Sequence, residues 1–117
     1  MSDINTLTER ILKYRDARDW KQIHNPKDEA LSLTLEATEV LEHFQWKNGK
    51  ELEEYVVSHK DHIGEELADV MYWVLLMCHD LDIDIVKACG NKMKQNELKY
   101  SVDKAKGSSK KYTEYQK

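Results

Sequence analysis

Residues 66–78 read ELADVMYWVLLMC, and this largely apolar run with two acidic side chains decides the fold. Its apolar positions recur at helical spacing, and we predict a long helix from about His59 to Leu81. A second stretch, LTLEATEVL at residues 33–41, again combines apolar side chains with two glutamates. The chain therefore contains two strongly apolar helices that each carry a pair of carboxylates.

The helix around residues 33–41 is predicted to begin at Asn25-Pro26, since asparagine caps helices and proline suits the first helical position. We expect it to run to about Trp46, with Asn48-Gly49 as its stop signal. The other main helices are predicted to begin at Ile4 and after Asp82 or Asp84, the last reaching about Tyr100. Residues 50–58 are expected to form a short helix or a helical loop.

Four main helices with short connections predict an all-α, antiparallel four-helix bundle. We expect residues 1–100 to form a single helical domain, followed by a Lys/Ser-rich C-terminal tail at 101–117. On the first helix, Ile4, Leu7, Ile11 and Leu12 form the apolar stripe, and Arg10, Arg15 and Arg18 are expected on its other faces.

The paired carboxylates are Glu36 with Glu39 and Glu66 with Asp69. Residues three apart on a helix are neighbours, so both members of each pair point the same way. If the pairs face each other, two charges about 5 Å apart at an effective dielectric near 20 repel by roughly 3 kcal/mol. Protonation, pairing with Lys or Arg, or a bound cation would each relieve this repulsion.

A metal ion is the simplest of these remedies, because no basic residue lies inside either pair. An all-oxygen ligand set favours Mg²⁺, Mn²⁺ or Ca²⁺ over Zn²⁺ or copper. A ferritin-like di-iron site needs Glu-x-x-His on two helices, and no histidine follows a glutamate by three residues here. The alternative is a solvated helix face, where glutamate pairs at this spacing are common.

The motifs Glu36-Ala37-Thr38-Glu39 and Glu66-Leu67-Ala68-Asp69 resemble those of MazG-like nucleotide pyrophosphohydrolases, in particular the dCTP pyrophosphatase branch. Flanking segments extend the resemblance over nearly the whole chain: Arg18-Asp19-Trp20, His24-Asn25-Pro26-Lys27, Phe44-Gln45-Trp46, Lys92-Met93 with Asn96 and Tyr100, and Ser109 to Glu114. Two positions depart from the family pattern: Ala37-Thr38 replaces a frequent glycine, and Ser101 replaces a frequent proline.

This resemblance implies hydrolysis of a nucleoside triphosphate to the monophosphate and pyrophosphate, with dCTP or a modified dCTP as substrate, in nucleotide pool sanitation. It implies that Glu36, Glu39, Glu66 and Asp69 hold Mg²⁺, with Mn²⁺ as a substitute. One of these carboxylates, or Glu65, would orient or deprotonate the attacking water. The residues that the resemblance and their side-chain chemistry nominate for substrate binding are Trp20, His24, Trp46, Trp73, Lys92, Asn96 and Tyr100.

Each of these binding candidates also has a plainer interpretation. The tryptophans could be ordinary core residues, and His24 could be a helix-entry residue. Lys92 and Asn96 could belong to a solvated face, as could Lys110 and Lys111 in the basic tail.

Composition limits the other partners. A formal net charge of −4 provides no broad basic field for nucleic acid, and no stretch reaches the length of a membrane span. The N-terminus shows no secretion signal, and Cys78 and Cys89 are expected as reduced, mostly buried thiols, so we expect a cytoplasmic protein. The wide apolar arcs of the middle helices predict contact with another copy of the chain, and the resemblance implies a homodimer or homotetramer.

Two alternatives remain at this stage. One is a pyrophosphatase of the same fold that acts on dUTP, on a damaged nucleotide or on a phosphoribosyl intermediate. The other is a non-enzymatic helical oligomer, such as an adaptor, that uses the carboxylates in salt bridges.

Overall fold

The computed structural model describes residues 3–110 and 113, and all regular elements among them are helices. The predicted all-α fold is therefore confirmed. Contacts divide the chain into two compact units, Met1–Asp82 and Ile83–Lys117. None of the described helices combines the length and the apolar character that a membrane crossing requires.

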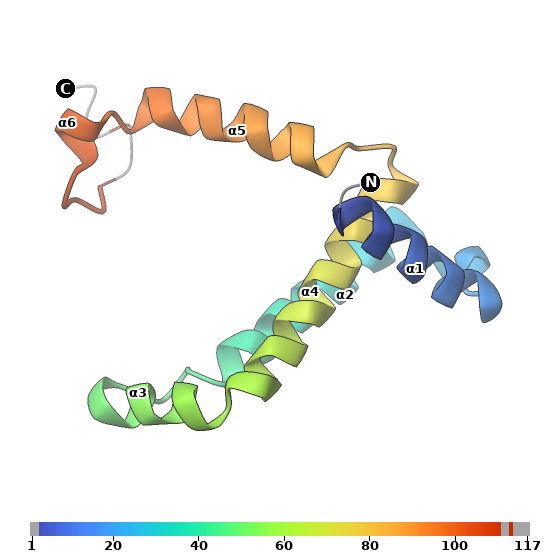
Figure 1. Cartoon of the computed structure of the whole chain (residues 1–117), viewed down its shortest axis with the longest axis horizontal. Coiled ribbons are helices and arrows are strands. Elements are labelled where there is room, and N and C mark those ends of the chain that lie inside the picture. The colour runs from blue at the N-terminus through green and yellow to red at the C-terminus, as the bar shows by residue number, and fades with distance from the viewer. Residues whose placement is uncertain (1–2, 111–112, 114–117) are drawn as a thin grey trace. The chain divides into compact units, whose positions relative to one another are not determined.

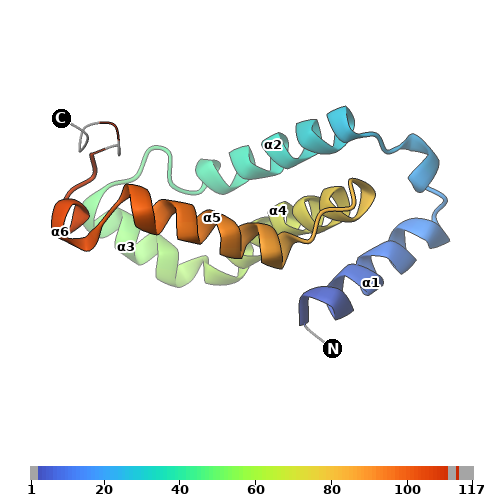
Figure 2. The same cartoon turned by 90° about the horizontal axis from the view of Figure 1, so that it is seen from above.

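The first unit is built around two long helices that run antiparallel, side by side (Figures 1 and 2). Its elements are α1 (Asp3–Ala17), the 3-10 turn η1 (Lys21–Ile23), α2 (Pro26–Glu42), α3 (Gly49–Ser58) and α4 (Lys60–Asp80). The central pair is α2 and α4, and α1 and α3 also contact α4. The two motifs of paired carboxylates thus lie on the two helices that pack most extensively.

Helix α2 begins where the sequence predicts. Asn25 is its N-cap, and its Oδ1 accepts a hydrogen bond of 2.9 Å from the backbone N–H of Asp28. Pro26 occupies the first turn, where its missing N–H costs no hydrogen bond. This cap fixes the point at which the chain leaves the connecting segment and begins the first carboxylate helix.

The predicted end of α2 at Trp46 is wrong, because the helix ends at Glu42. The backbone N–H groups of His43 and Phe44 donate to carbonyls three residues back, so the last turn tightens and the helix stops. A side-chain contact also holds this corner, with His43 Nδ1 at 2.6 Å from the hydroxyl of Tyr55 on α3. Gly49, at a φ of +56°, is the first residue of α3 and not the stop signal of α2.

The buried interior of the first unit mixes apolar and charged side chains. The buried apolar residues among those described are Ile11, Leu75 and Leu76. Arg15 and Glu29 are each only 1% exposed. The expectation that Arg15 lies on a polar face of α1 is therefore wrong; its guanidinium forms an ion pair with Asp80 at the end of α4.

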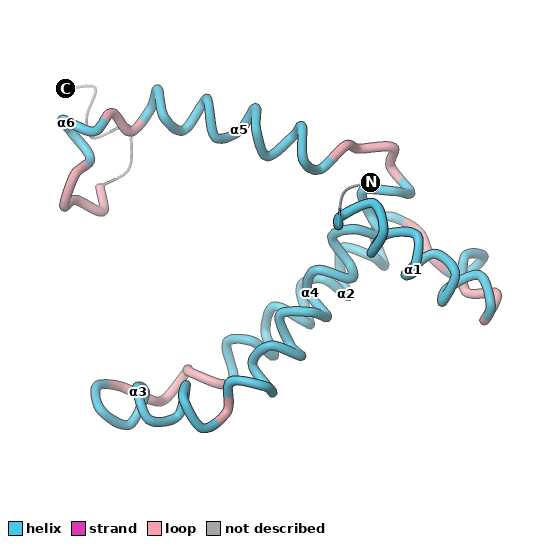
Figure 3. The backbone as a smooth tube through the Cα atoms, viewed as in Figure 1, coloured by secondary structure: helices cyan, strands magenta, loops and turns pink. Residues whose placement is uncertain are grey.

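The second unit contains α5 (Ile85–Lys99) and the short α6 (Val102–Ala105), joined by a short loop (Figure 3). Asp84 caps α5 by accepting a hydrogen bond of 3.0 Å from the backbone N–H of Lys87, which confirms one of the two predicted starts.

The two cysteines differ in burial. Cys78 is half-buried and Cys89 on α5 is exposed, so the prediction of buried thiols is wrong for Cys89.

Candidate metal centre and nucleotide cavity

Four carboxylates converge between α2 and α4. Glu36 and Glu39 come from α2, and Glu66 and Asp69 come from α4. One ligand oxygen from each residue lies within 4.8 Å of those of the other three. The structure thus brings together all four of the predicted metal ligands, and the i, i+3 spacing on two antiparallel helices is the cause.

The electrostatics of this cluster favour a positive counter-ion. Burial, a hydrogen bond with Glu39 and the charges of the other carboxylates raise the pKa of Glu36 to about 7. A hydrogen bond with Glu39 and partial burial also raise the pKa of Glu66. Both pKa values move in the direction expected when negative charges crowd together without a cation.

The donor set fits a hard divalent cation. All four donors are carboxylate oxygens, and the buried Oε2 of Glu36 has no hydrogen-bond donor among the described residues. Within residues 3–82, no Lys or Arg forms an ion pair with any of the four. Mg²⁺ and Mn²⁺ prefer such oxygen ligands and commonly bind through carboxylates and substrate phosphates together.

A cavity of about 650 Å³ adjoins the carboxylate cluster. Asp69 belongs to both, since its carboxylate joins the cluster and its side chain lines the cavity. The cavity is lined by Leu7, Arg10, Ile11, Tyr14, Trp20, Ile23, His24, Asp69, Tyr72 and Trp73. Its size and its mixture of aromatic and polar side chains suit a ligand as large as a nucleoside.

The aromatic walls of the cavity contact one another edge to face. The ring centroids of Tyr14 and Trp20 are 5.6 Å apart, and those of Tyr72 and Trp73 are 5.1 Å apart. The ring of His24 meets Trp73 at 5.4 Å. Edge-to-face packing of this kind holds the rings in defined orientations and leaves aromatic surface for a flat ligand.

His24 is tuned towards its neutral form. Burial, followed by the nearby positive charge of Arg15, lowers its pKa below the usual value of 6.5. A neutral imidazole at the cavity wall has one donor and one acceptor nitrogen. Such a group is suited to hydrogen bonding with a base or a sugar.

The predicted binding residues fall into three groups. Trp20, His24 and Trp73 line the cavity. Trp46 lies in the turn after α2, where it is 83% exposed, and it does not line the cavity. Lys92, Asn96 and Tyr100 belong to α5 or its C-cap in the second unit, and Lys111 of the predicted basic tail lies outside the described residues.

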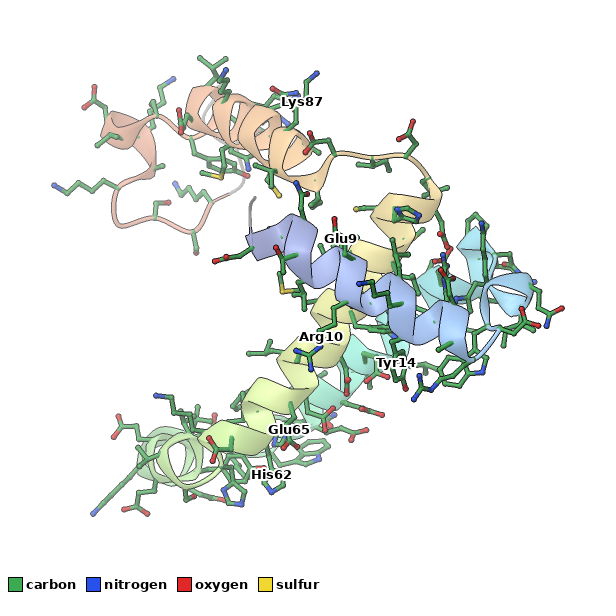
Figure 4. The ribbon with its side chains drawn as sticks, turned by 45° about the vertical axis from the view of Figure 1, so that its right-hand side comes forward. Glu9, Arg10, Tyr14, His62, Glu65 and Lys87 are labelled. Atoms are coloured by element: carbon green, nitrogen blue, oxygen red, sulfur yellow. The ribbon has the colours of Figure 1, made fainter. Side chains whose placement is uncertain are left out.

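Sequence analysis missed Arg10, Tyr14 and Tyr72, which also line the cavity. Figure 4 shows Arg10 and Tyr14 on the side of α1 that faces α4. Their spacing of four residues places them on one face of α1, and Tyr72 follows Asp69 by three positions on α4. The spacing from Asp69 could have identified Tyr72 as a neighbour of the site on α4, whereas nothing in the sequence places the face of α1 with Arg10 and Tyr14 beside Asp69.

Glu65, the other residue predicted to orient or deprotonate the attacking water, lies beside His62. Its side chain is 74% exposed, and its Oε2 lies 3.5 Å from Nδ1 of His62 one turn earlier on α4 (Figure 4). Glu65 is not among the four residues whose carboxylate oxygens converge.

Comparison with known proteins shows what this chain is similar to. The crystal structure of a pyrophosphatase from Archaeoglobus fulgidus matches with a TM-score of 0.81 at 34% identity, covering 86% of this chain and 94% of that chain. The dCTP pyrophosphatase 1 of rat is 34% identical over 99 residues, and the human protein is 35% identical over 99 residues. These residues cover 83% of this chain but 58% of each mammalian protein, so the chain spans less than two thirds of those relatives.

The family profile gives the same answer over a range that includes both carboxylate motifs. It matches residues 31–115, which contain α2 from Leu31 onwards and all of α4. The resemblance inferred from the two motifs and their flanks is confirmed, and this chain belongs to the MazG-like family.

Proposed function

We propose that this protein is a Mg²⁺-dependent nucleoside triphosphate pyrophosphohydrolase that converts a (d)NTP and water into the (d)NMP and diphosphate. The observation that carries the proposal is the double role of Asp69, which joins the carboxylate cluster and lines the aromatic cavity. A nucleoside in the cavity would have its phosphates beside the cluster. The relatives named as dCTP pyrophosphatases support the same reaction class.

In this proposal the clustered carboxylates bind the metal ion and activate the water. Glu36, Glu39, Glu66 and Asp69 hold Mg²⁺, with Mn²⁺ as a substitute. A cation held there would supply neutralisation of the phosphate charge and a lowered pKa for a water. A carboxylate of the cluster would orient the attacking water and accept its proton. The water oxygen would form a new bond to the α-phosphorus as the bond from that phosphorus to the diphosphate leaving group breaks.

The base would occupy the aromatic cavity. Trp20 and Trp73 offer ring surface, and His24 offers a hydrogen bond. For Lys92, Asn96 and Tyr100, the proposed contact with phosphate or sugar rests on the sequence resemblance alone. The proposed substrate is dCTP or a modified dCTP. Hydrolysis of this substrate would serve nucleotide pool sanitation in the cytoplasm. We also propose that the protein works as a homodimer or homotetramer.

A pyrophosphate-release panel tests the reaction and the substrate together. The common and several modified nucleoside triphosphates are assayed with Mg²⁺ against wild type, Glu39→Gln and Glu53→Gln. Glu39→Gln should lose at least about a hundredfold in turnover, more than typical losses from residues that only support a ligand. Glu53→Gln, which changes an exposed glutamate on α3, should be fully active.

The outcomes of this panel separate the proposal from its rivals. Turnover confined to dUTP or to a non-pyrimidine nucleotide would reject the substrate preference and keep the chemistry. No release from any nucleotide would reject the enzyme. In that case, an adaptor would also show no rise in melting temperature with Mg²⁺ and a non-hydrolysable nucleotide, whereas a genuine ligand site stabilises the fold by mass action.

A further inference from the structure

A second cluster of charged groups lies in the first unit, apart from the carboxylate cluster, with Arg15 and Glu29 buried and the Asp80 side chain 21% exposed. Arg15 near the end of α1 donates from Nη1 and Nη2 to the two oxygens of Asp80, at 2.7 and 3.0 Å. Glu29, in the first turn of α2, lies within hydrogen-bonding reach of Asp80. Arg15 and Glu29 are each 1% exposed, which is unusual for charged residue types.

The charges of this cluster do not balance without a proton. Two carboxyl groups face one guanidinium, and ionisation of both would leave a net negative charge around the buried Arg15 and Glu29. Among the described residues, no donor reaches either oxygen of Glu29. A proton on Glu29 solves both problems, because it neutralises the cluster and supplies the hydrogen that the oxygens of Asp80 can accept.

We propose that Glu29 is a positioning residue for the nucleotide cavity: in its protonated form it donates a hydrogen bond to Asp80 and thereby holds His24 against Trp73. This inference rests on the proposed function only in naming the cavity's ligand. The protonation and the placement of His24 are properties of the fold.

The connection from this cluster to the cavity runs through the segment between α1 and α2. At one end, the carbonyl of Arg15 accepts a hydrogen bond of 3.2 Å from the backbone N–H of Trp20. At the other end, the backbone N–H of Glu29 donates to the carbonyl of Asn25 at 2.9 Å. The segment that carries Trp20 and His24 is thus anchored at both ends by residues of the cluster.

His24 forms a wall between two cavities. On one side is the 650 Å³ cavity, where its ring meets Trp73. On the other side is a smaller cavity of about 240 Å³ that Glu29 and Asp80 also line. Glu29 and Asp80 thus share the lining of this smaller cavity with His24.

Electrostatics support the protonated form of Glu29. Burial, then the hydrogen bond and the charge of Asp80, raise its pKa to about 7, although Arg15 opposes this shift. Burial works to raise the pKa of Asp80 too, but its hydrogen bonds with Arg15 and Glu29 lower it overall. The other charged or titratable groups that act on this cluster are Asp16 on α1, Lys21 and His24 in the connecting segment, and His79 on α4.

The test compares Glu29→Gln, which keeps a donor and cannot ionise, with Glu29→Leu, which has a similar volume and no donor. In the metal-free wild type, the ¹³C carboxyl resonance that Glu29→Gln removes should titrate near pH 7, not near the ordinary value of about 4.3. The nuclear Overhauser contact between the rings of His24 and Trp73 should persist in Glu29→Gln and weaken in Glu29→Leu.

Steady-state kinetics with dCTP and Mg²⁺ then test whether the position of His24 affects substrate binding. Glu29→Leu should raise KM about tenfold, the size expected for one lost hydrogen bond, with kcat much less affected because the carboxylate cluster is intact. In the wild type, KM should rise as Glu29 ionises when pH increases through 7. Glu29→Gln should keep the wild-type KM at pH 6, and its KM should rise less over this pH range, since only the titration of Glu36 then remains. A merely structural role would lower the melting temperature of Glu29→Leu without separating KM from kcat.

Two results would overturn the proposal. One is a carboxyl midpoint near 4 for Glu29, and the other is an unchanged KM in a folded Glu29→Leu protein. If Glu29→Leu does not fold, the titration and the pH response of Glu29→Gln still decide the matter. If the wild type hydrolyses no nucleotide, the proposed function fails while the titration and ring-contact measurements still test Glu29.

Discussion

Glu36 is the residue whose protonation should link metal binding to pH. Its folded pKa is about 7, against an ordinary 4.5. Between these values the folded protein holds a proton that the unfolded chain releases, so metal-free stability falls as pH rises through this window. A divalent cation requires the ionised form, so the rise in melting temperature on adding MgCl₂ should be larger at pH 8 than at pH 6.

The control for this prediction is Glu36→Gln, which should show little Mg²⁺-induced shift at either pH. Differential scanning calorimetry at fixed ionic strength measures both proteins. Because Glu29 also titrates near pH 7, the quantity to compare is the shift caused by Mg²⁺, not the absolute melting temperature. Equal shifts at pH 6 and pH 8 in the wild type would show that Glu36 carries no displaced proton.

At this same scale, the sequence predicted the four clustered carboxylates and missed the buried ion pair. Glu36 and Glu39 are local partners, so helical spacing alone orients them. Arg15 and Asp80 are 65 positions apart, and only the packing of α1 against α4 brings them together. Charged residues are normally exposed, so the expectation for Arg15 followed the general rule and failed where a buried partner reverses it.

Among the helices, the caps offer a matched pair of substitutions. The Asn25 side chain accepts a hydrogen bond from the first turn of α2, whereas Asn48 caps α3 without a side-chain hydrogen bond. Asn25→Ala should therefore cost about 1 kcal/mol in the free energy of unfolding, and Asn48→Ala much less. Urea denaturation followed by circular dichroism measures both, and equal losses would mean that Asn25 does not stabilise α2 through its cap.

Helix starts were easier to predict than helix ends. Asn25-Pro26 and Asp84 carry local signals that the structure confirms. The end of α2 at Glu42 had no such signal, because residues 43–46 contain neither glycine nor proline. There the backbone hydrogen bonds of the last turn reach carbonyls three residues back instead of four, and His43 contacts Tyr55 of α3. The second of these is a tertiary interaction.

For the whole molecule, the small buried core supports the prediction of self-association. The buried apolar side chains among the described residues are Ile11, Leu75 and Leu76. The central helices meanwhile present large apolar side chains one turn apart: Leu31 and Leu35 on α2 are each 57% exposed, and Leu67 and Met71 on α4 are 52% and 39% exposed. Covering these side chains with a second copy would remove apolar area from water.

Light scattering coupled to size-exclusion chromatography tests this expectation. The wild-type protein should have the mass of two or four chains. Leu67→Asp should shift the population towards the monomer, because an unpaired charge in a subunit interface is strongly unfavourable. Val57→Asp on α3 is the matched control; Val57 is 80% exposed as a scattered apolar residue, and its replacement should leave the mass unchanged. A wild-type monomer at micromolar concentration would mean that these leucines face water in the working protein.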